Sequence, residues 1–169
     1  MIYSTLLHIL LSRENYYRFK DYVKPHIVPK EIHDIITGYD QYYRDNPTID
    51  NISLDNFITW YKICKVSSLS KEKHSIYDKI FSSLESTLPT EEESTNTIEF
   101  LLEKDYSIRM SDYLLKISEG DDTKCIVDVE DMFEEYKSES AKLGSKDDIF
   151  ESSSIAEVLA NHRRGGLDW

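Results

Sequence analysis

The sequence predicts an all-α protein with a compact helical head, a long antiparallel helical hairpin and a C-terminal linker helix. Only five glycines and four prolines occur in 169 residues, which favours helices over a turn-rich β fold. Apolar side chains recur at spacings of three and four along most of the chain, as on amphipathic helices. We therefore expect a helical head at 1–90, a helical hairpin at 91–143, and a linker with a short docking helix at 144–169.

The head is expected to be a bundle of about five short helices. The first, at 2–11, is apolar enough to be buried. The others begin after residues suited to helix starts, namely Ser12, Pro29, Ser53 and Ser70. The helix at 54–65 is expected to supply the centre of the core, with Ile63 among its buried positions. Gly38 either kinks its helix or allows close packing.

Aromatic residues dominate the second head helix, at 13–23, and alternate there with basic side chains. The aromatic members are Tyr16, Tyr17, Phe19 and Tyr22, and the basic ones are Arg18, Lys20 and Lys24. Such a mixture can stack single-stranded bases. Glu14 and Asp21 reduce the net positive charge of this segment. We therefore interpret this stripe of aromatic residues as core packing and keep base stacking as the alternative.

The hairpin begins with the longest periodic segment of the chain, at 96–118. Asn96 can cap this helix with Glu99 as its capping-box partner, and Gly120 can end it. A second apolar-periodic segment follows and continues towards Leu143. Two helices cannot bury both faces of a hairpin, so we expect the hairpin to pack on the head, on a copy of itself or on a partner.

After the hairpin, the polar and acidic stretch at 144–154 is typical of a linker. A short amphipathic helix at 155–162 follows, with Ser154 as its cap and Ile155, Val158 and Leu159 as a one-sided apolar stripe. Because so short a helix is marginal by itself in water, we expect it to dock on another surface. The final Leu-Asp-Trp resembles the start of a further segment, so we expect the sequence to be part of a longer protein.

The net charge of −12 is confined to the second half of the chain. Residues 1–90 contain 11 basic and 11 acidic side chains, whereas residues 91–169 contain 9 basic and 21 acidic ones. Phosphate binding requires an excess of Lys and Arg, so direct nucleic-acid binding by the hairpin is not expected. The acidic surface is either a solvated helix face, a site for a basic partner, or a surface that repels DNA.

No motif for catalysis or cofactor binding is evident. The sequence contains no phosphate-binding loop, no HExxH and no GxSxG. His26, His33 and Asp34 lie near one another without a third metal ligand. Several glutamates can meet across the hairpin, but the helical di-iron pattern also needs histidines, which the hairpin lacks. We expect no enzymatic activity, no metal and no cofactor, and keep a carboxylate-bridged metal enzyme as a remote alternative.

The N-terminal apolar segment at 1–12 is too short to span a bilayer and has no signal-peptide features. Cys64 and Cys125 are the only cysteines, and without a secretion signal we expect two reduced thiols in the core. These features predict a cytoplasmic protein without a membrane partner.

Two stretches carry a resemblance to a known family. SSIAEVLANHRRGGLDW, residues 153–169, and IEFLLEKDYSIRMSDYLLKISEGD, residues 98–121, resemble the linker helix and the first hairpin helix of bacteriophage replicative DNA helicases of the DnaB type. The order of head, hairpin, linker and docking helix is also similar to the N-terminal part of those proteins. Nothing in the chain matches the phosphate loop of their ATPase domain, so the resemblance implies a non-catalytic domain of an ATP-dependent helicase.

That resemblance implies an oligomerisation and partner-docking role in DNA replication, in the cytoplasm of a host bacterium. The implied partners are other copies, as a dimer or a hexameric ring, the RecA-like motor domain of a neighbouring subunit, and a primase or helicase loader. The docking face of the linker helix would be Ile155, Val158 and Leu159. The residues implied in hairpin pairing are Leu101, Ile108, Leu115, Met132, Phe133 and Tyr136.

Two alternatives remain open. The apolar residues of the hairpin can pack against the head, since one apolar stripe needs only one neighbour. The acidic second half can instead belong to a DNA mimic or inhibitor that binds a basic nucleic-acid enzyme. Exposure of the hairpin's apolar residues in the structure distinguishes packing on the head from a free surface.

Overall fold

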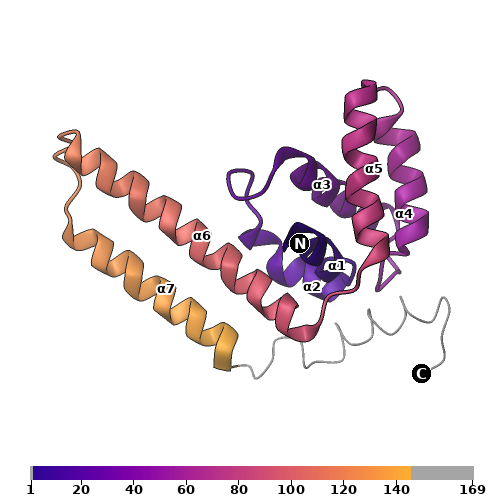
Figure 1. Ribbon diagram of the computed structural model, residues 1–169. Coiled ribbons are helices and arrows are strands. Elements are labelled where there is room, and N and C mark those ends of the chain that lie inside the picture. The colour runs from indigo at the N-terminus through magenta and orange to yellow at the C-terminus, as the bar shows by residue number, and fades with distance from the viewer. Residues whose placement is uncertain (1, 146–169) are drawn as a thin grey trace.

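The computed structural model describes residues 2–145, and the predicted all-α fold is confirmed for them (Figure 1). A 3₁₀ turn, η1 (Lys20–Tyr22), follows the second helix, and a π-helical turn, η2 (Lys62–Val66), follows the fourth. The only pairing of extended backbone in this part is an isolated bridge between Ser12 and Asn51. The α-helices are α1 (Ile2–Ile9), α2 (Arg13–Phe19), α3 (Lys30–Asp45), α4 (Leu54–Tyr61), α5 (Lys71–Ser86), α6 (Glu91–Ser118) and α7 (Val127–Ser145).

Helix α1 lies at the centre of the core, in contact with α3, α5 and α6. A central helix needs partners for the free carbonyl groups at its C-terminal end. Two tyrosines of α3 donate to carbonyls at this end and just after it: the Tyr39 hydroxyl to the Leu7 carbonyl at 3.0 Å, and the Tyr43 hydroxyl to the Leu10 and Leu11 carbonyls at 3.0 and 2.7 Å. Each phenol thereby fills the core with its ring and satisfies a buried backbone group with its hydroxyl.

The buried tyrosines make the stability of the fold depend on alkaline pH. Burial raises the pKa of Tyr39, Tyr43 and Tyr61 above the ordinary value of 10.0. The folded chain therefore holds these protons more tightly than the unfolded chain does. Their contribution to stability is complete below about pH 10 and is lost as the pH rises above it. We expect the free energy of unfolding to fall as the pH rises from about 10 to about 12 in urea titrations; an unchanged value would contradict this packing.

Gly38 allows α3 to approach the aromatic side chains of α4 closely. A Cβ atom at this position would lie 2.9 Å from Cε2 of Tyr61 and 3.3 Å from Cζ of Phe57. Both rings are buried, and Tyr61 also packs edge-on against Phe81 with the ring centroids 5.8 Å apart. Of the two roles predicted for Gly38, the structure therefore supports close packing.

We expect Gly38→Ala to destabilise the protein, although alanine favours helices over glycine by about 1 kcal/mol. The added methyl group overpacks a rigid aromatic cluster, which costs about 1–3 kcal/mol. The net effect is a lower melting temperature, measured by circular dichroism. A suitable control is Thr37→Ala, one residue earlier on the exposed side of α3. A higher melting temperature for Gly38→Ala would contradict the close approach.

Several helix starts agree with the sequence, and one does not. Ser12 and Ser70 cap α2 and α5 by accepting hydrogen bonds from backbone N–H groups, whereas Ser53 stands at the start of α4 without such a bond. The predicted cap of the hairpin helix at Asn96 is wrong. The cap lies six residues earlier, at Thr90, which forms a reciprocal capping box with Glu93, so that α6 begins at Glu91.

Two further expectations about the core are wrong. Ile63 is 67% exposed, because the chain leaves α-helical geometry after Tyr61 and the π-helical turn changes its register. Cys64 and Cys125 are free, as expected, but both are exposed rather than in the core. In the aromatic stripe of the second helix, Tyr16 and Phe19 are buried, so for them the interpretation as core packing is confirmed.

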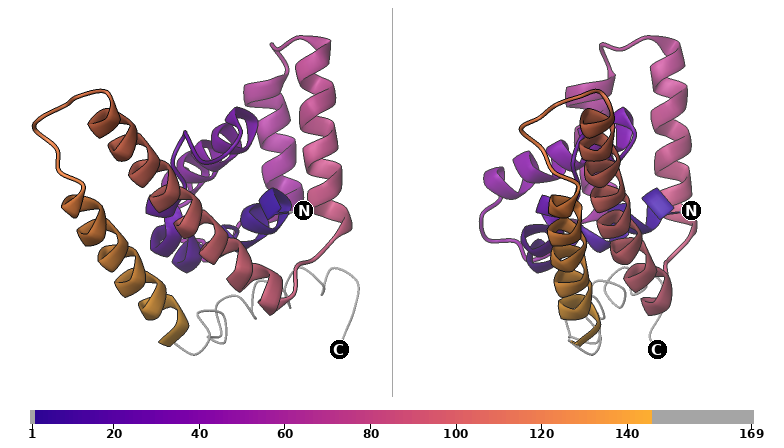
Figure 2. Two further views of the ribbon diagram at one scale, coloured as in Figure 1. Left: turned by 60° about the vertical axis from the view of Figure 1, so that its left-hand side comes forward. Right: turned by 90° about the vertical axis from the view of Figure 1, so that its left-hand side faces the viewer.

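Two pairs of helices extend from the core in different directions (Figures 1 and 2). One pair consists of α4 and α5, joined by η2 and a short turn. The other consists of α6 and α7, which lie side by side and run antiparallel, so that Tyr106 packs on Tyr136 and Tyr113 hydrogen-bonds to Asp128. The two pairs diverge, so that their free ends lie apart.

Candidate docking surface on the helical hairpin

The first half of α6 belongs to the core of the head. Its inner positions follow the helical spacing of three and four and are all buried: Ser94, Thr97, Ile98, Leu101, Leu102, Asp105 and Tyr106. They pack mainly on α1. Fixing this half of a continuous helix also fixes the direction in which the second half leaves the head.

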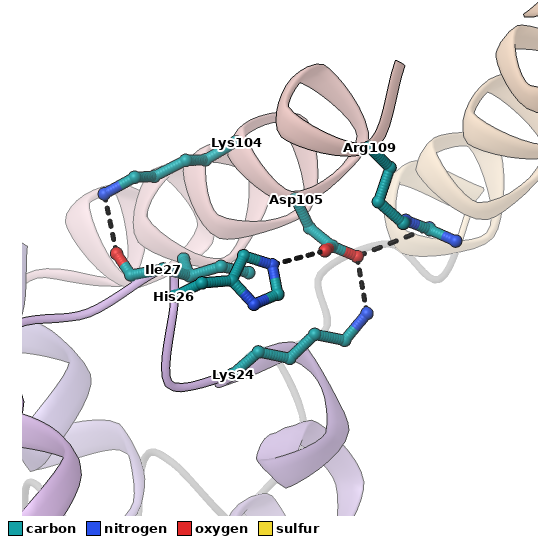
Figure 3. Close-up of polar contacts among 6 residues, drawn as sticks. All are labelled: Lys24, His26, Ile27, Lys104, Asp105 and Arg109. Carbon is teal, nitrogen blue, oxygen red and sulfur yellow. Dashed lines mark hydrogen bonds and ion pairs between the residues drawn. The ribbon is translucent and has the colours of Figure 1, made fainter. Parts of the chain in front are cut away.

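Asp105 attaches α6 to the loop that follows η1 (Figure 3). Its carboxylate is almost completely buried and lies within 3.4 Å of nitrogen atoms of Lys24, His26 and Arg109. Lys24 Nζ lies 2.8 Å from one oxygen, Arg109 lies 3.3 Å from the same oxygen, and His26 Nε2 lies 3.4 Å from the other. One residue before Asp105, Lys104 donates to the Ile27 carbonyl at 2.6 Å. The loop at 24–28 is therefore held to the middle of α6 by charges as well as by the core.

Aromatic and apolar side chains fill the space between α6 and α7. The rings of Tyr106 and Tyr136 meet edge to face with centroids 5.5 Å apart, and the Arg109 guanidinium lies 4.1 Å from the Tyr106 ring. Burial raises the pKa of Tyr106 to about 12. Met132 and Leu143 face inward one turn before and two turns after Tyr136, and Leu143 is buried.

The connection between the two helices has a defined conformation. Gly120 follows α6 with a φ of 93°, the left-handed conformation that glycine adopts most readily after a helix. Asp121 then accepts a hydrogen bond from the Thr123 hydroxyl and one from the Thr123 backbone N–H, at 3.0 Å for the latter. These bonds lower the pKa of the Asp121 carboxyl. The end of the hairpin is thus a structured turn that presents the residues beside it in fixed positions.

Large apolar side chains are exposed at this end of the hairpin. Ile126 is 65% exposed, Val127 59% and Leu115 56%, and Leu114 and Phe133 are also exposed. They lie where α6 ends and α7 begins, beyond the part of α6 that the head covers. Several exposed apolar side chains near one end of a helix pair indicate an interaction site. We call residues 109–139 the acidic arm.

The residues implied in hairpin pairing lie in different environments. Leu101 is fully buried in the head core, so in this structure it is not available to another copy. Ile108, Met132 and Tyr136 are partly covered, and Tyr136 packs against the core. Leu115 and Phe133 are exposed. Ile155, Val158 and Leu159 lie outside the described residues.

Sequence reasoning did not identify the residues that position the arm. Lys24 and Asp105 are 81 residues apart, and no local pattern indicates that they meet. His26 is partly exposed beside Asp105, in keeping with a surface histidine. Ile126 and Val127 belonged to the apolar periodicity of the second hairpin helix, but their positions before and at its first residue leave them outside the helix pair.

Neither a metal site nor a membrane-spanning helix is found in the described part of the chain. Residues 2–145 contain no group of three or more metal-ligating side chains, and none of their helices is long and apolar enough to cross a membrane. No family model, curated protein or solved structure matches the chain. The acidic arm is therefore the surface on which the functional interpretation rests.

Proposed function

We propose that the chain is a non-catalytic oligomerisation and partner-docking domain, and that the end of the acidic arm is its docking surface. The observation that carries this proposal is the exposure of Ile126, Val127 and Leu115 on a rigidly attached hairpin. Burying an aliphatic side chain against a partner contributes about 1.5–3 kcal/mol when it starts fully exposed. Ile126, Val127 and Leu115 are already partly covered by the chain itself. Burying all three against a partner would therefore contribute a substantial part of this free energy.

Rigid attachment supports the same proposal. The acidic arm continues a helix whose first half is in the core, and Asp105 fixes it to the loop at 24–28. A surface held in one orientation loses little conformational entropy when it binds, which favours association. A loosely tethered hairpin would not present its apolar residues in one arrangement.

In the most specific form of the proposal, the chain is the domain that precedes the motor domain in the sequence of a phage DnaB-type replicative helicase. The support is the resemblance of residues 98–121 and 153–169 to those proteins. In this setting the acidic arm would assemble copies into a collar, and the segment after residue 145 would lead to the motor domain. A primase or loader would be a further partner of the assembled collar.

A double substitution at the end of the arm tests the docking surface. We expect Ile126→Ser together with Val127→Ser to shift sedimentation velocity profiles towards the monomer of 19.8 kDa, while circular dichroism and thermal stability stay unchanged. The matched control is Phe100→Ser, an exposed aromatic position on α6 next to the head. Equal association of the double variant and the unaltered chain would contradict the proposal.

A further inference from the structure

The second pair of helices carries the opposite charge to the acidic arm. Residues 62–82, which comprise η2, the turn after it and most of α5, contain five lysines and only two acidic residues, Glu72 and Asp78. We call this segment the basic arm. Residues 109–139 of the acidic arm contain four basic and ten acidic residues. The whole-chain charge of −12 hides this local contrast.

Three lysines of the basic arm are free to meet a partner. Lys65, Lys71 and Lys79 are exposed and form no ion pair with any residue from 2 to 145. The other two lysines are paired, Lys62 with Asp78 at 3.3 Å and Lys73 with Glu31 at 3.7 Å. A basic arm with three unneutralised ammonium groups attracts acidic surfaces.

The basic arm also exposes apolar side chains next to a shallow groove. The groove has a volume of about 580 Å³, and its lining includes Leu69, Lys71, His74 and Lys79. Ile63 is 67% exposed, and Leu69 and Ile76 are exposed as well. Nucleic acid would neutralise the lysines but leave these apolar groups in water. A protein surface that is both acidic and apolar complements all of them.

The acidic arm has that combination. Glu130 and Asp131 lie three and four residues after Val127 on α7, so each is a neighbour of Val127 on the helix surface. Glu130 and Asp131 are exposed and have no ion pair with any residue of the described chain. Ile126 lies directly before Val127. Carboxylates and exposed aliphatic groups therefore occur together on this arm, as ammonium and aliphatic groups do on the other.

We propose that the acidic arm of one copy docks on the basic arm of a second copy, in a head-to-tail contact. This inference rests on the proposed assembly function and names the partner of its docking surface. The free ends of the two arms of one copy lie apart (Figures 1 and 2), so each arm can meet a different neighbour. Contacts of this kind, between two different surfaces, generate closed rings or open filaments.

The two native cysteines allow a direct test without new substitutions. Cys64 lies on the basic arm and Cys125 on the acidic arm, and both are free and exposed. Unlabelled protein is mixed with nitrogen-15-labelled protein and treated with a short bismaleimide. Mass spectrometry of the digested product then identifies which cysteines are joined and whether they come from different copies. Cys64→Ser and Cys125→Ser serve as controls, since each removes the expected link.

We expect mixed-isotope links between Cys64 of one copy and Cys125 of another. The number of these links should fall as salt is raised, because salt screens the attraction between the two arms. Links only between two Cys125 residues would mean that hairpins pair with each other, which overturns head-to-tail docking but retains the assembly function. No link between copies, together with a monomeric mass at every concentration, would overturn both.

Charge reversal provides an independent test. One variant carries Lys65→Glu, Lys71→Glu and Lys79→Glu, and the other carries Asp122→Lys, Glu130→Lys and Asp131→Lys. In each variant alone, the two arms no longer carry complementary charges. Its self-association is therefore expected to weaken at least about tenfold. Mixed together, the two variants retain one unaltered interface between them, so association is expected to return. Unchanged self-association of either variant would contradict the inference.

Discussion

Leu101→Ala is expected to lower the free energy of unfolding by about 2–5 kcal/mol, because it leaves a cavity in a close-packed core. Leu101 is 0% exposed and lies between α6 and the rest of the head. Leu115→Ala, fourteen residues later on the same helix, is expected to change the free energy of unfolding by no more than about 0.5 kcal/mol. Leu115 is 56% exposed and has little packing to lose. Urea unfolding monitored by circular dichroism measures both.

The two leucines give a matched comparison of fold and assembly. Leu115→Ala is expected to weaken association between copies while it leaves stability intact, since the side chain belongs to the proposed docking surface. Association of the folded Leu101→Ala protein should be unchanged under conditions where it remains native. A large loss of stability from Leu115→Ala would show that the end of the arm is part of the core, and would contradict the account.

Asp105→Ala is expected to have the second largest effect, a loss of about 1–3 kcal/mol. The carboxylate is buried, but the side chains that contact it, those of Lys24, His26 and Arg109, are each more than a third exposed. Water can therefore solvate the cations once the carboxylate is gone, which keeps the loss below that of a fully buried pair. Asp105→Asn, which retains the shape without the charge, should recover part of the stability.

A double-mutant cycle with Lys24→Met isolates the ion pair from the loss of packing. We expect a coupling energy of about 0.5–3 kcal/mol between positions 24 and 105, measured by urea unfolding at low salt. Asp112→Ala, at an exposed position one turn beyond Arg109 on α6, is the control and should show no coupling with Lys24→Met. Additive effects of the two substitutions would mean that the contact between Lys24 and Asp105 does not hold the acidic arm to the head.

The all-α fold follows from local features of the sequence. Glycine and proline are scarce, apolar residues repeat every three or four positions, and serines at two helix starts cap them as expected. The start of α6 was misplaced because residues 91–95 are polar and acidic and resemble a loop. In the structure the same glutamates occupy the first turn of a helix, where the helix dipole favours negative charge.

The division of the hairpin into a covered part and a free part is not encoded locally. Leu101 and Leu115 are fourteen residues apart, nearly four helical turns, and therefore face almost the same side of α6. One is buried and the other exposed only because the head ends between them. The Lys24–Asp105 contact has the same origin, since it depends on how the loop at 24–28 meets α6 in three dimensions.

The central claim, that exposed apolar and charged arms assemble this chain, is tested most directly by its solution mass. Light scattering of the unaltered protein is measured over a dilution series at about 0.05 M and about 0.5 M salt. The account predicts masses above the 19.8 kDa of one chain that rise with concentration and fall with added salt. A mass of 19.8 kDa at every concentration and in both salt conditions would contradict it.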